Sequence, residues 1–393
     1  MKSLPHSFLG RGECSSQRGF TLIELMVAMT LGLAIVGAVT YVYLQGKQGF
    51  TVQDSRSRLQ ENARLAYSII SRDIMSGGYF GCVKPIVDNN SGIAVSTLRI
   101  TAAQPLMTAD IDWLEVDGDQ TQGERFFNPA LSIRGYDNGS GWPATTGLAA
   151  KRLAGTDTII VLKGGDDARQ LTAAPDAPYE SFTLNSAIDG VTKNGRARPM
   201  VISNCTRGEV IKPTIQASGT QFSVANTLNQ NAKGLDSGAN LLRYGNRYGE
   251  GSMVTTFDPV SYYVAAAKGK NGVAVPSLFR MVTQWDTDVS ANVGLWQTSG
   301  GDVLIEGVER FQVRYFAEGA SENTSEGPFT AAQMTANAKW ASLVAVQVEL
   351  TLVGDDDNLR TETTTQTVGG ISVTDSKLRL NTSFNVNVRV PKA

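Results

Sequence analysis

The chain has 393 residues, a formal net charge of −2 and 41 % hydrophobic residues. This length is enough for a soluble core besides a membrane segment, and 40 glycines favour a turn-rich protein. A near-neutral charge gives no overall basic footprint for nucleic acid. The only histidine is His6, close to the start of the chain.

The N-terminal stretch combines a polar leader with a long apolar run. The leader ends at Gly19, and the apolar run extends from Phe20 to about Tyr43, with Glu24 as its single charge. More than 18 consecutive apolar residues predict a transmembrane helix. A carboxylate inside such a segment costs roughly 2.5–3.5 kcal/mol on insertion scales, so Glu24 indicates a functional partner. The basic residues of the leader are Lys2, Arg11 and Arg18.

The stretch Arg-Gly-Phe-Thr-Leu-Ile-Glu, residues 18–24, resembles the class III signal of type IV prepilins and type II secretion pseudopilins. The resemblance implies that residues 1–19 are a leader peptide, which a prepilin peptidase removes between Gly19 and Phe20. It also implies N-methylation of Phe20 and an assembly role for Glu24, whose carboxylate pairs with the N-terminal amine of a neighbouring subunit. The alternative is an uncleaved signal anchor with a chance glutamate. A secretory signal would place its small-residue cleavage site after the apolar region.

The basic leader also predicts the orientation of the chain in the inner membrane. Positive charges stay on the cytoplasmic side, so the N-terminus is cytoplasmic and the rest of the chain is periplasmic before assembly. Removal of the leader would remove His6, which excludes a Ser-His-Asp triad, a Cys-His pair and a His-ligated metal site. We therefore predict neither an enzyme nor a cofactor.

Two cysteines remain after the leader, because Cys14 lies within it. In an oxidising compartment Cys82 and Cys205 would form a disulfide. In the chain-entropy model such a bridge, closing a loop of about 120 residues, is worth nearly 5 kcal/mol at most. The alternative is two buried free thiols.

Residues 20–44 are predicted to form the transmembrane helix, and residues 45–78 its amphipathic continuation, ending at Gly77-Gly78. One apolar face is expected from residues three and four apart. This face comprises Leu59, Ala63, Ala66, Ile70 and Ile74. The charged residues Arg56, Arg58, Glu61, Arg64, Arg72 and Asp73 are expected to lie largely off it.

The end of this helix carries a second motif. Asp73-Ile74 followed by the Gly-Tyr-Phe-Gly-Cys run of residues 78–82 resembles the PilW-type minor pilins of type IV pili. The segments at 277–280, 306–315 and 344–350 resemble the C-terminal part of the same family. The motif-poor middle matches least.

Residues 79–393 are predicted to form a β-rich globular domain. Strands are expected at 112–116, 158–162, 200–205, 260–265 and 277–282, and loops near 138–143 and 173–178. Period-two alternation follows, partly at 303–316 and clearly at 342–353 and 383–390. The expected fold class is α+β and pilin-like. A long N-terminal helix packs on a mostly antiparallel sheet with an elaborated, loop-rich middle.

Acidic clusters are the main candidates for a metal site, since calcium takes several oxygen ligands. The Glu115-x-Asp117-x-Asp119 spacing is similar to a calcium loop, but Gln120 replaces the required glycine. Solvated loop carboxylates are the preferred interpretation, and no metal is predicted. The other acidic residues considered are Asp110, Asp112, Glu124 and Asp355 to Asp357, and the tryptophans expected in the core or turns are Trp113, Trp142, Trp285, Trp296 and Trp340.

The resemblance implies a structural protein. It would be a minor pilin that primes type IV pilus assembly, is incorporated at or near the tip, and serves twitching motility, adhesion or DNA uptake. Implied partners are the prepilin peptidase, other minor pilins, the major pilin, a tip-associated adhesin and the inner-membrane assembly platform; no nucleic acid is directly predicted. After assembly the chain would lie in the pilus at the cell surface. The alternatives are a minor pseudopilin of type II secretion and a pilin-anchored adhesive or ligand-binding module.

Overall fold

The fold is described from a computed structural model of the chain, which forms two compact units, Met1–Asp54 and Ser55–Ala393. The residues that it describes are 19–81, 86–87, 94–95, 98–100, 115–117, 125–127, 132–142, 151–175, 181–188, 192–193, 196–197, 200–205, 208–211, 214–215, 219–223, 248–269, 272, 274–282, 301–319, 324–354, 363–368 and 371–388. The arrangement is α+β, with a long helix and mainly antiparallel sheets, as predicted.

Helix α1, Leu22–Met75, is continuous through Gly46 and Gly49. Both glycines lie in open space, with no atom within 4 Å of where a Cβ would stand. The helix ends just before Gly77-Gly78, as expected. Gly78 adopts a φ of 76°, which glycine reaches without steric cost, and its N–H donates to the Leu162 carbonyl at 2.8 Å.

The C-terminal part of α1 buries one face within the second unit. Its buried residues are Ser55, Leu59, Ala66, Ile70, Ser71, Asp73 and Ile74. Four of the five predicted apolar residues are therefore buried, and Ala63 is half-buried. The prediction for Asp73 is wrong, because its side chain is fully buried. Leu59, Ala66 and Asp73 are spaced seven apart, which places all three on the same helix face.

The larger sheet is organised around strand β16, Met253–Lys268, which is buried over most of its length. The strand order is β18-β17-β16-β12-β13-β3-β5-β4. Off this path, β7 and β8 each pair with β16, and β6 pairs with β7. All pairs are antiparallel except β13 with β3. The bounds are β3 Leu98–Ile100, β4 Glu115–Asp117, β5 Arg125–Phe127, β6 Ile133–Tyr136, β7 Thr158–Gly164, β8 Arg169–Gln170, β12 Met200–Ser203, β13 Gly208–Ile211, β17 Ala274–Val282 and β18 Asp302–Glu306.

The C-terminal sheet has the order β20-β19-β21-β24 and is antiparallel throughout. Its strands are β19 Val308–Glu318, β20 Ser325–Phe329, β21 Leu343–Val353 and β24 Arg379–Asn387. The single strand predicted at 303–316 is wrong, because Gly307 divides it into β18 and β19, which belong to different sheets. Gly307 has a φ of 74°, and a Cβ there would stand 2.4 Å from the Val353 carbonyl oxygen, so the break depends on glycine.

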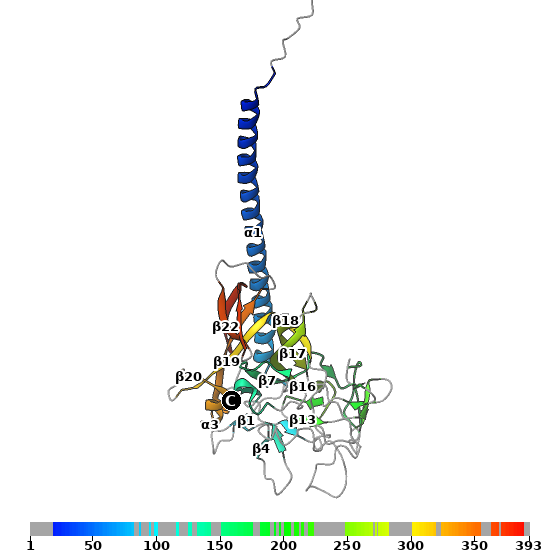
Figure 1. Cartoon of the computed structure of the whole chain (residues 1–393). Helices are drawn as coiled ribbons and strands as arrows, with labels where there is room; N and C mark the ends of the chain where they lie inside the picture. Colours follow the sequence, from blue (N-terminus) through cyan, green and yellow to red (C-terminus); the bar gives the residue numbers. More distant parts are fainter. Residues whose placement is uncertain are drawn as a thin grey trace, which may run out of the picture. The chain divides into compact units, whose positions relative to one another are not determined.

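Small elements complete the second unit. They are the pairs β1 Ile86–Val87 with β2 Ala94–Val95, β10 Thr192–Lys193 with β11 Arg196–Ala197, and β22 Thr364–Val368 with β23 Ile371–Asp375. A further sheet has the order β14-β15-β9, formed by Thr214–Ile215, Gln221–Ser223 and Ser181–Thr183. The short helices are η4 Asp137–Gly139, α3 Ala331–Ala336 and η7 Trp340–Ser342. Figure 1 labels β7, β16, β17 and β19 near the C-terminal turns of α1.

Candidate functional site: the N-terminal motif and the helix anchor

The predicted cleavage site lies just before helix α1. Gly19 and Phe20 are in non-helical backbone, Gly19 has no atom within 4 Å of a Cβ position, and 83 % of Phe20 is exposed. An exposed, non-helical peptide bond is the form that a peptidase can bind in an extended conformation. This geometry supports cleavage between Gly19 and Phe20, which stays a prediction. Arg18 and the rest of the leader lie outside the described residues.

Thr21 is the N-cap of α1. Its Oγ1 accepts the backbone N–H of Glu24 at 3.3 Å, and its carbonyl accepts the Leu25 N–H at 3.2 Å. Thr-x-x-Glu is the spacing of a capping box, and an acidic side chain in the first turn also suits the helix dipole. Glu24 therefore has a local structural role besides its predicted assembly role. Among the described contacts its exposed carboxylate has no hydrogen bond or ion pair.

The first part of α1 is apolar and exposed on every side. The large apolar side chains from Phe20 to Leu44 are between 51 % and 83 % exposed. Leu22 to Leu44 spans about 34 Å at 1.5 Å per residue, enough for a hydrocarbon core of about 30 Å. The hydroxyls of Thr30 and Thr40 donate to the Val27 and Val36 carbonyls, so neither needs water as a hydrogen-bond acceptor. α1 is the one helix in the described chain long and apolar enough to cross a membrane.

The last turn of α1 is anchored by a buried carboxylate, Asp73. One oxygen, Oδ2, accepts the Tyr262 hydroxyl at 2.5 Å and the Arg280 Nε at 2.7 Å. The other, Oδ1, lies 3.1 Å from Nζ of Lys163, whose side chain is 4 % exposed. Lys163 also pairs with the exposed Asp166 at 3.0 Å. Asp73 thus ties the helix to β7, β16 and β17 at once.

These contacts keep Asp73 ionised despite its burial. Desolvation alone would raise the pKa of Asp73, but hydrogen bonds from Arg280 and Tyr262, and the charges of Arg280 and Lys163, more than offset it and hold the pKa below its ordinary value. Burial and the adjacent carboxylate raise the pKa of Tyr262, so its hydroxyl remains a donor. Burial would lower the pKa of Arg280, yet its hydrogen bond and ion pair with Asp73 raise it.

The residues that follow α1 also contact the strands to which Asp73 anchors the helix, and their neighbours. The Gly164 N–H donates to the Tyr79 carbonyl at 2.8 Å, and the buried Phe80 ring stacks on Phe257 with centroids 5.2 Å apart. Tyr79 itself is 60 % exposed. A Cβ on Gly81 would lie 2.7 Å from Ser203 Oγ, so this segment runs directly against the end of β12.

The other candidate residues of the sequence are placed only in part. Cys205 is exposed and is bonded to no other cysteine in the described part of the chain, while Cys82 lies outside that part, so their pairing stays a prediction. Trp142 and Trp340 are buried, as expected. The acidic candidates at 110–124 and 355–357 lie outside the described side chains, and within the described part no group of three His, Cys, Asp or Glu residues could hold a metal ion.

The class of protein follows from this geometry. An apolar helix of membrane-spanning length that starts just after Phe20, carries Glu24 in its first turn and continues into an antiparallel β domain is the arrangement of a prepilin-like protein. Two family matches agree with it. Residues 14–40 match the prokaryotic N-terminal methylation motif, and residues 261–391 match the type IV pilus-assembly protein W, PilW.

The chain therefore carries an N-terminal prepilin motif and a C-terminal part that matches the type IV pilus-assembly protein PilW, which confirms both resemblances. It is a structural, non-enzymatic protein. The motif implies processing by a prepilin peptidase, and it is consistent with inner-membrane anchoring before assembly. Searches of curated proteins and of solved structures gave no match.

Proposed function

We propose that this chain is a minor pilin that primes type IV pilus assembly and is incorporated at or near the pilus tip. The observation that carries the proposal is the exposed apolar part of α1 with a single unpaired carboxylate, Glu24, in its first turn. A surface of this kind is stable only in lipid or against other apolar helices. Pilus assembly would move it from the first environment to the second.

Processing would create the partner that Glu24 lacks. Cleavage after Gly19 leaves an amine on Phe20, methylated in the mature chain, at the edge of the apolar segment. An amine and a carboxylate are each costly in an apolar environment unless they are paired. Pairing Glu24 with the amine of a neighbouring subunit would select the axial register between the two helices.

The test of this role is Glu24→Val, with Glu24→Asp as the matched control that keeps the charge. Cleavage depends on the segment around Gly19, so both variants are expected to be processed normally. Glu24→Val should be strongly depleted from sheared pili, whereas Glu24→Asp should be incorporated at least in part. Immunoblots of the membrane and sheared fractions give both readings. Wild-type levels of Glu24→Val in pili would contradict the assembly role.

The implied partners are other minor pilins, the major pilin, the inner-membrane assembly platform and a tip-associated adhesin. The domain would be periplasmic before assembly and at the cell surface afterwards. The PilW match at 261–391 favours a pilus over a type II secretion pseudopilus. Loss of surface pili with intact secretion in a deletion strain would support this choice; loss of secretion alone would contradict it.

We also propose a disulfide between Cys82 and Cys205. Gly81, next to Cys82, packs against Ser203 in β12, two residues before Cys205. The segment that precedes Cys82 therefore lies close to the strand that precedes Cys205. Such proximity is needed for a disulfide, in which the two Cα atoms are about 4.4–6.8 Å apart. Cys205 is exposed at the end of this strand, where a thiol is accessible to oxidation.

A further inference from the structure

Strand β24 forms an edge of the C-terminal sheet. Among the described strands only β21 pairs with it, in a register that runs from Val353↔Arg379 to Ala345↔Asn387. The Val388 N–H donates to the Val344 carbonyl, so the backbone groups of Val388 and of every second residue before it point towards β21. Because backbone groups alternate along an antiparallel strand, the N–H and C=O of the other set point away from β21. That set is Asn381, Ser383, Asn385 and Asn387.

The composition of β24 leaves this edge open to pairing. From Leu380 to Val388 the sequence has no charged residue and no proline, the features that commonly block the addition of another strand. The side chains of Asn381, Ser383 and Asn385 are exposed. On the α1 side of the strand, Phe384 contacts the ring of Tyr67, which is itself 48 % exposed.

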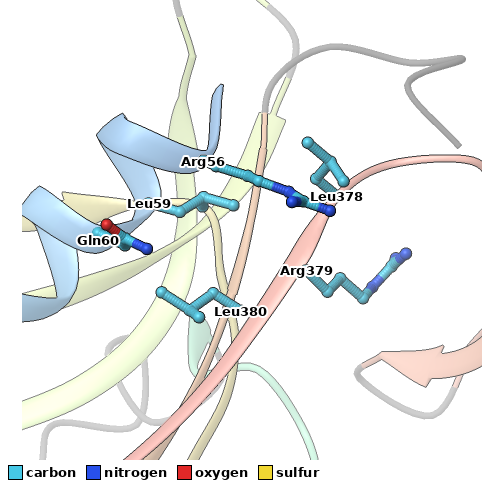
Figure 2. Close-up of a pocket in the computed structure, with 6 residues that line it drawn as sticks. All are labelled: Arg56, Leu59, Gln60, Leu378, Arg379 and Leu380. Carbon is cyan, nitrogen blue, oxygen red and sulfur yellow. The ribbon is translucent and has the colours of Figure 1, made fainter. Parts of the chain in front are cut away.

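A groove lies where α1 passes the start of β24. It has a volume of about 480 Å³ and is lined by Arg56, Leu59 and Gln60 of the helix and by Leu378, Arg379 and Leu380. Figure 2 shows the Arg56 side chain extending from the helix towards Leu378, with the Arg379 side chain directed away from the helix. Leu59 and Leu378 are buried, so the groove has an apolar floor beneath the Arg56 guanidinium.

The two arginines of the groove differ in their pairing. Arg379 is satisfied by Glu309, at 2.8 and 3.0 Å, and by Asp375, at 2.6 and 2.9 Å. No carboxylate in the described part of the chain pairs with Arg56, which is exposed. The free positive charge of the groove therefore belongs to Arg56, and it is suited to a carboxylate from outside the described structure.

We propose that the outward edge of β24 and the adjoining groove bind an extended, acidic segment of a different pilus subunit by strand addition. The segment would pair with the backbone groups of Ser383 and Asn385 and place a carboxylate near Arg56. Main-chain hydrogen bonds would supply most of the affinity. The charge and the apolar floor of the groove would supply the specificity. The inference rests on the proposed pilin function and names one contact surface for it.

Charge argues against a second copy of this chain as the occupant. In an antiparallel β24–β24 pair, the residues that follow Asn387 in one copy approach the residues that precede Leu380 in the other, beside Arg56. The sequence after Asn387 carries Arg389 and Lys392. Like charges directly opposite each other destabilise a strand pair, which favours a different subunit over a β24–β24 pair of two copies.

The test is photo-crosslinking of the full-length chain in piliated cells. A benzophenone amino acid replaces Asn385, and the control position is Ala332, which is exposed on α3 near β19 and β20 rather than β24. Crosslinking from position 385 to another pilus subunit, with little product from position 332, is the expected result. Mass spectrometry of the adduct identifies the partner and its acidic segment.

Three variants of the crosslinking chain separate strand pairing from charge. Ser383→Pro removes an outward N–H without removing a bond to β21, and it should reduce the product at least tenfold. Arg56→Glu should reduce it about threefold to tenfold, the range of an exposed ion pair whose charge is reversed. Arg64→Glu, an equal change on an exposed residue of the same helix outside the groove, should leave the product unchanged.

Unchanged product from Ser383→Pro and Arg56→Glu would overturn the proposal, as would a product that contains only a second copy of this chain. Absence of a crosslink from position 385 while the chain is present in sheared pili would also overturn it and leave the proposed function intact. Absence of the chain from sheared pili would instead contradict the proposed function and, with it, the identity of the partner.

Discussion

Replacement of Asp73 by asparagine tests how α1 is held in the second unit. Asparagine has nearly the same shape and can still accept one hydrogen bond from Tyr262 or Arg280, but it carries no charge. Removing one member of a buried ion pair costs roughly 3–5 kcal/mol because the remaining charge is left uncompensated. In the variant Lys163 would still have its ion pair with Asp166, at 3.0 Å. The Arg280 side chain is 22 % exposed, so water can partly solvate its charge, and both features reduce the cost.

We therefore expect Asp73→Asn to lower the free energy of unfolding by about 2–4 kcal/mol. This is a large share of the roughly 5–15 kcal/mol that stabilises a typical domain. For a unit of this size the melting temperature should fall by about 2–4 °C per kcal/mol. The assay is thermal and urea unfolding of the full-length chain in detergent micelles, followed by tryptophan fluorescence, since Trp142 and Trp340 are buried.

The matched control is Arg72→Gln, which removes an exposed charge from the neighbouring position of the same turn. A surface change of this kind should stay within about 0.5 kcal/mol of the wild type. The reasoning would be refuted if Asp73→Asn were as stable as the control. It would also be refuted if both variants lost the same amount, because the loss would then not depend on the buried ion pair.

Acidification should reveal the same contact. The folded-state pKa of Asp73 lies below its ordinary value, so its contribution is fully present above the ordinary carboxyl range. That contribution is lost as the pH falls below about 4. The stability difference between the wild type and Asp73→Asn should therefore shrink between pH 5 and about pH 3. A difference that stays constant over this window would mean that the carboxylate charge is not responsible.

Three further predictions concern the β domain. Asp137 accepts two backbone N–H groups at the start of α3, at 2.9 and 2.8 Å, so Asp137→Ala should cost about 1 kcal/mol in urea unfolding; no change would contradict a capping role. Gly135→Ala would place a Cβ 1.7 Å from the Tyr315 hydroxyl, so overpacking should cost about 1–3 kcal/mol; a stable variant would show that the aromatic ring can shift freely. If Cys82 and Cys205 form the proposed disulfide, the mature chain from the periplasm should contain no titratable thiol before reduction and two afterwards; free thiols before reduction would exclude the bridge.

Local patterns were sufficient to predict the elements that carry the function. The apolar run after Gly19, the single charge of Glu24 and the glycine pair after Met75 describe α1, and all three depend on residues adjacent in the sequence. The period-two alternation at 342–353 likewise predicted β21, in which Val346, Val348, Leu350 and Leu352 are all buried. Strong short-range periodicity is the signal that a single sequence reports best.

The anchor of α1 was missed because its contacts are long-range. Asp73 meets Lys163, Tyr262 and Arg280 on three different strands, and no local pattern in the sequence pairs these residues. A weaker signal was nevertheless present, since the spacing of seven from Leu59 through Ala66 places Asp73 on the buried face of the helix. A charged residue is ordinarily expected on the solvent side of a helix, whereas Asp73 can be buried because its charge is paired.

The division at Gly307 was missed for a different reason. The alternating residues on both sides read as one strand, and only a positive φ with the Val353 carbonyl at close range separates them. An isolated glycine within a strand pattern signals such a break only weakly. Its consequence here is that β18 and β19 join different sheets, one containing β16 and the other ending in the β24 edge.

Processing as a prepilin and incorporation into a type IV pilus can be tested together by intact-mass measurement and N-terminal sequencing of the chain recovered from sheared pili. The recovered chain should begin with N-methylated Phe20 and lack residues 1–19. Recovery of a chain that still begins with Met1 from the pilus fraction, or its complete absence from that fraction while it is present in the membrane, would show that it is not a processed pilus subunit.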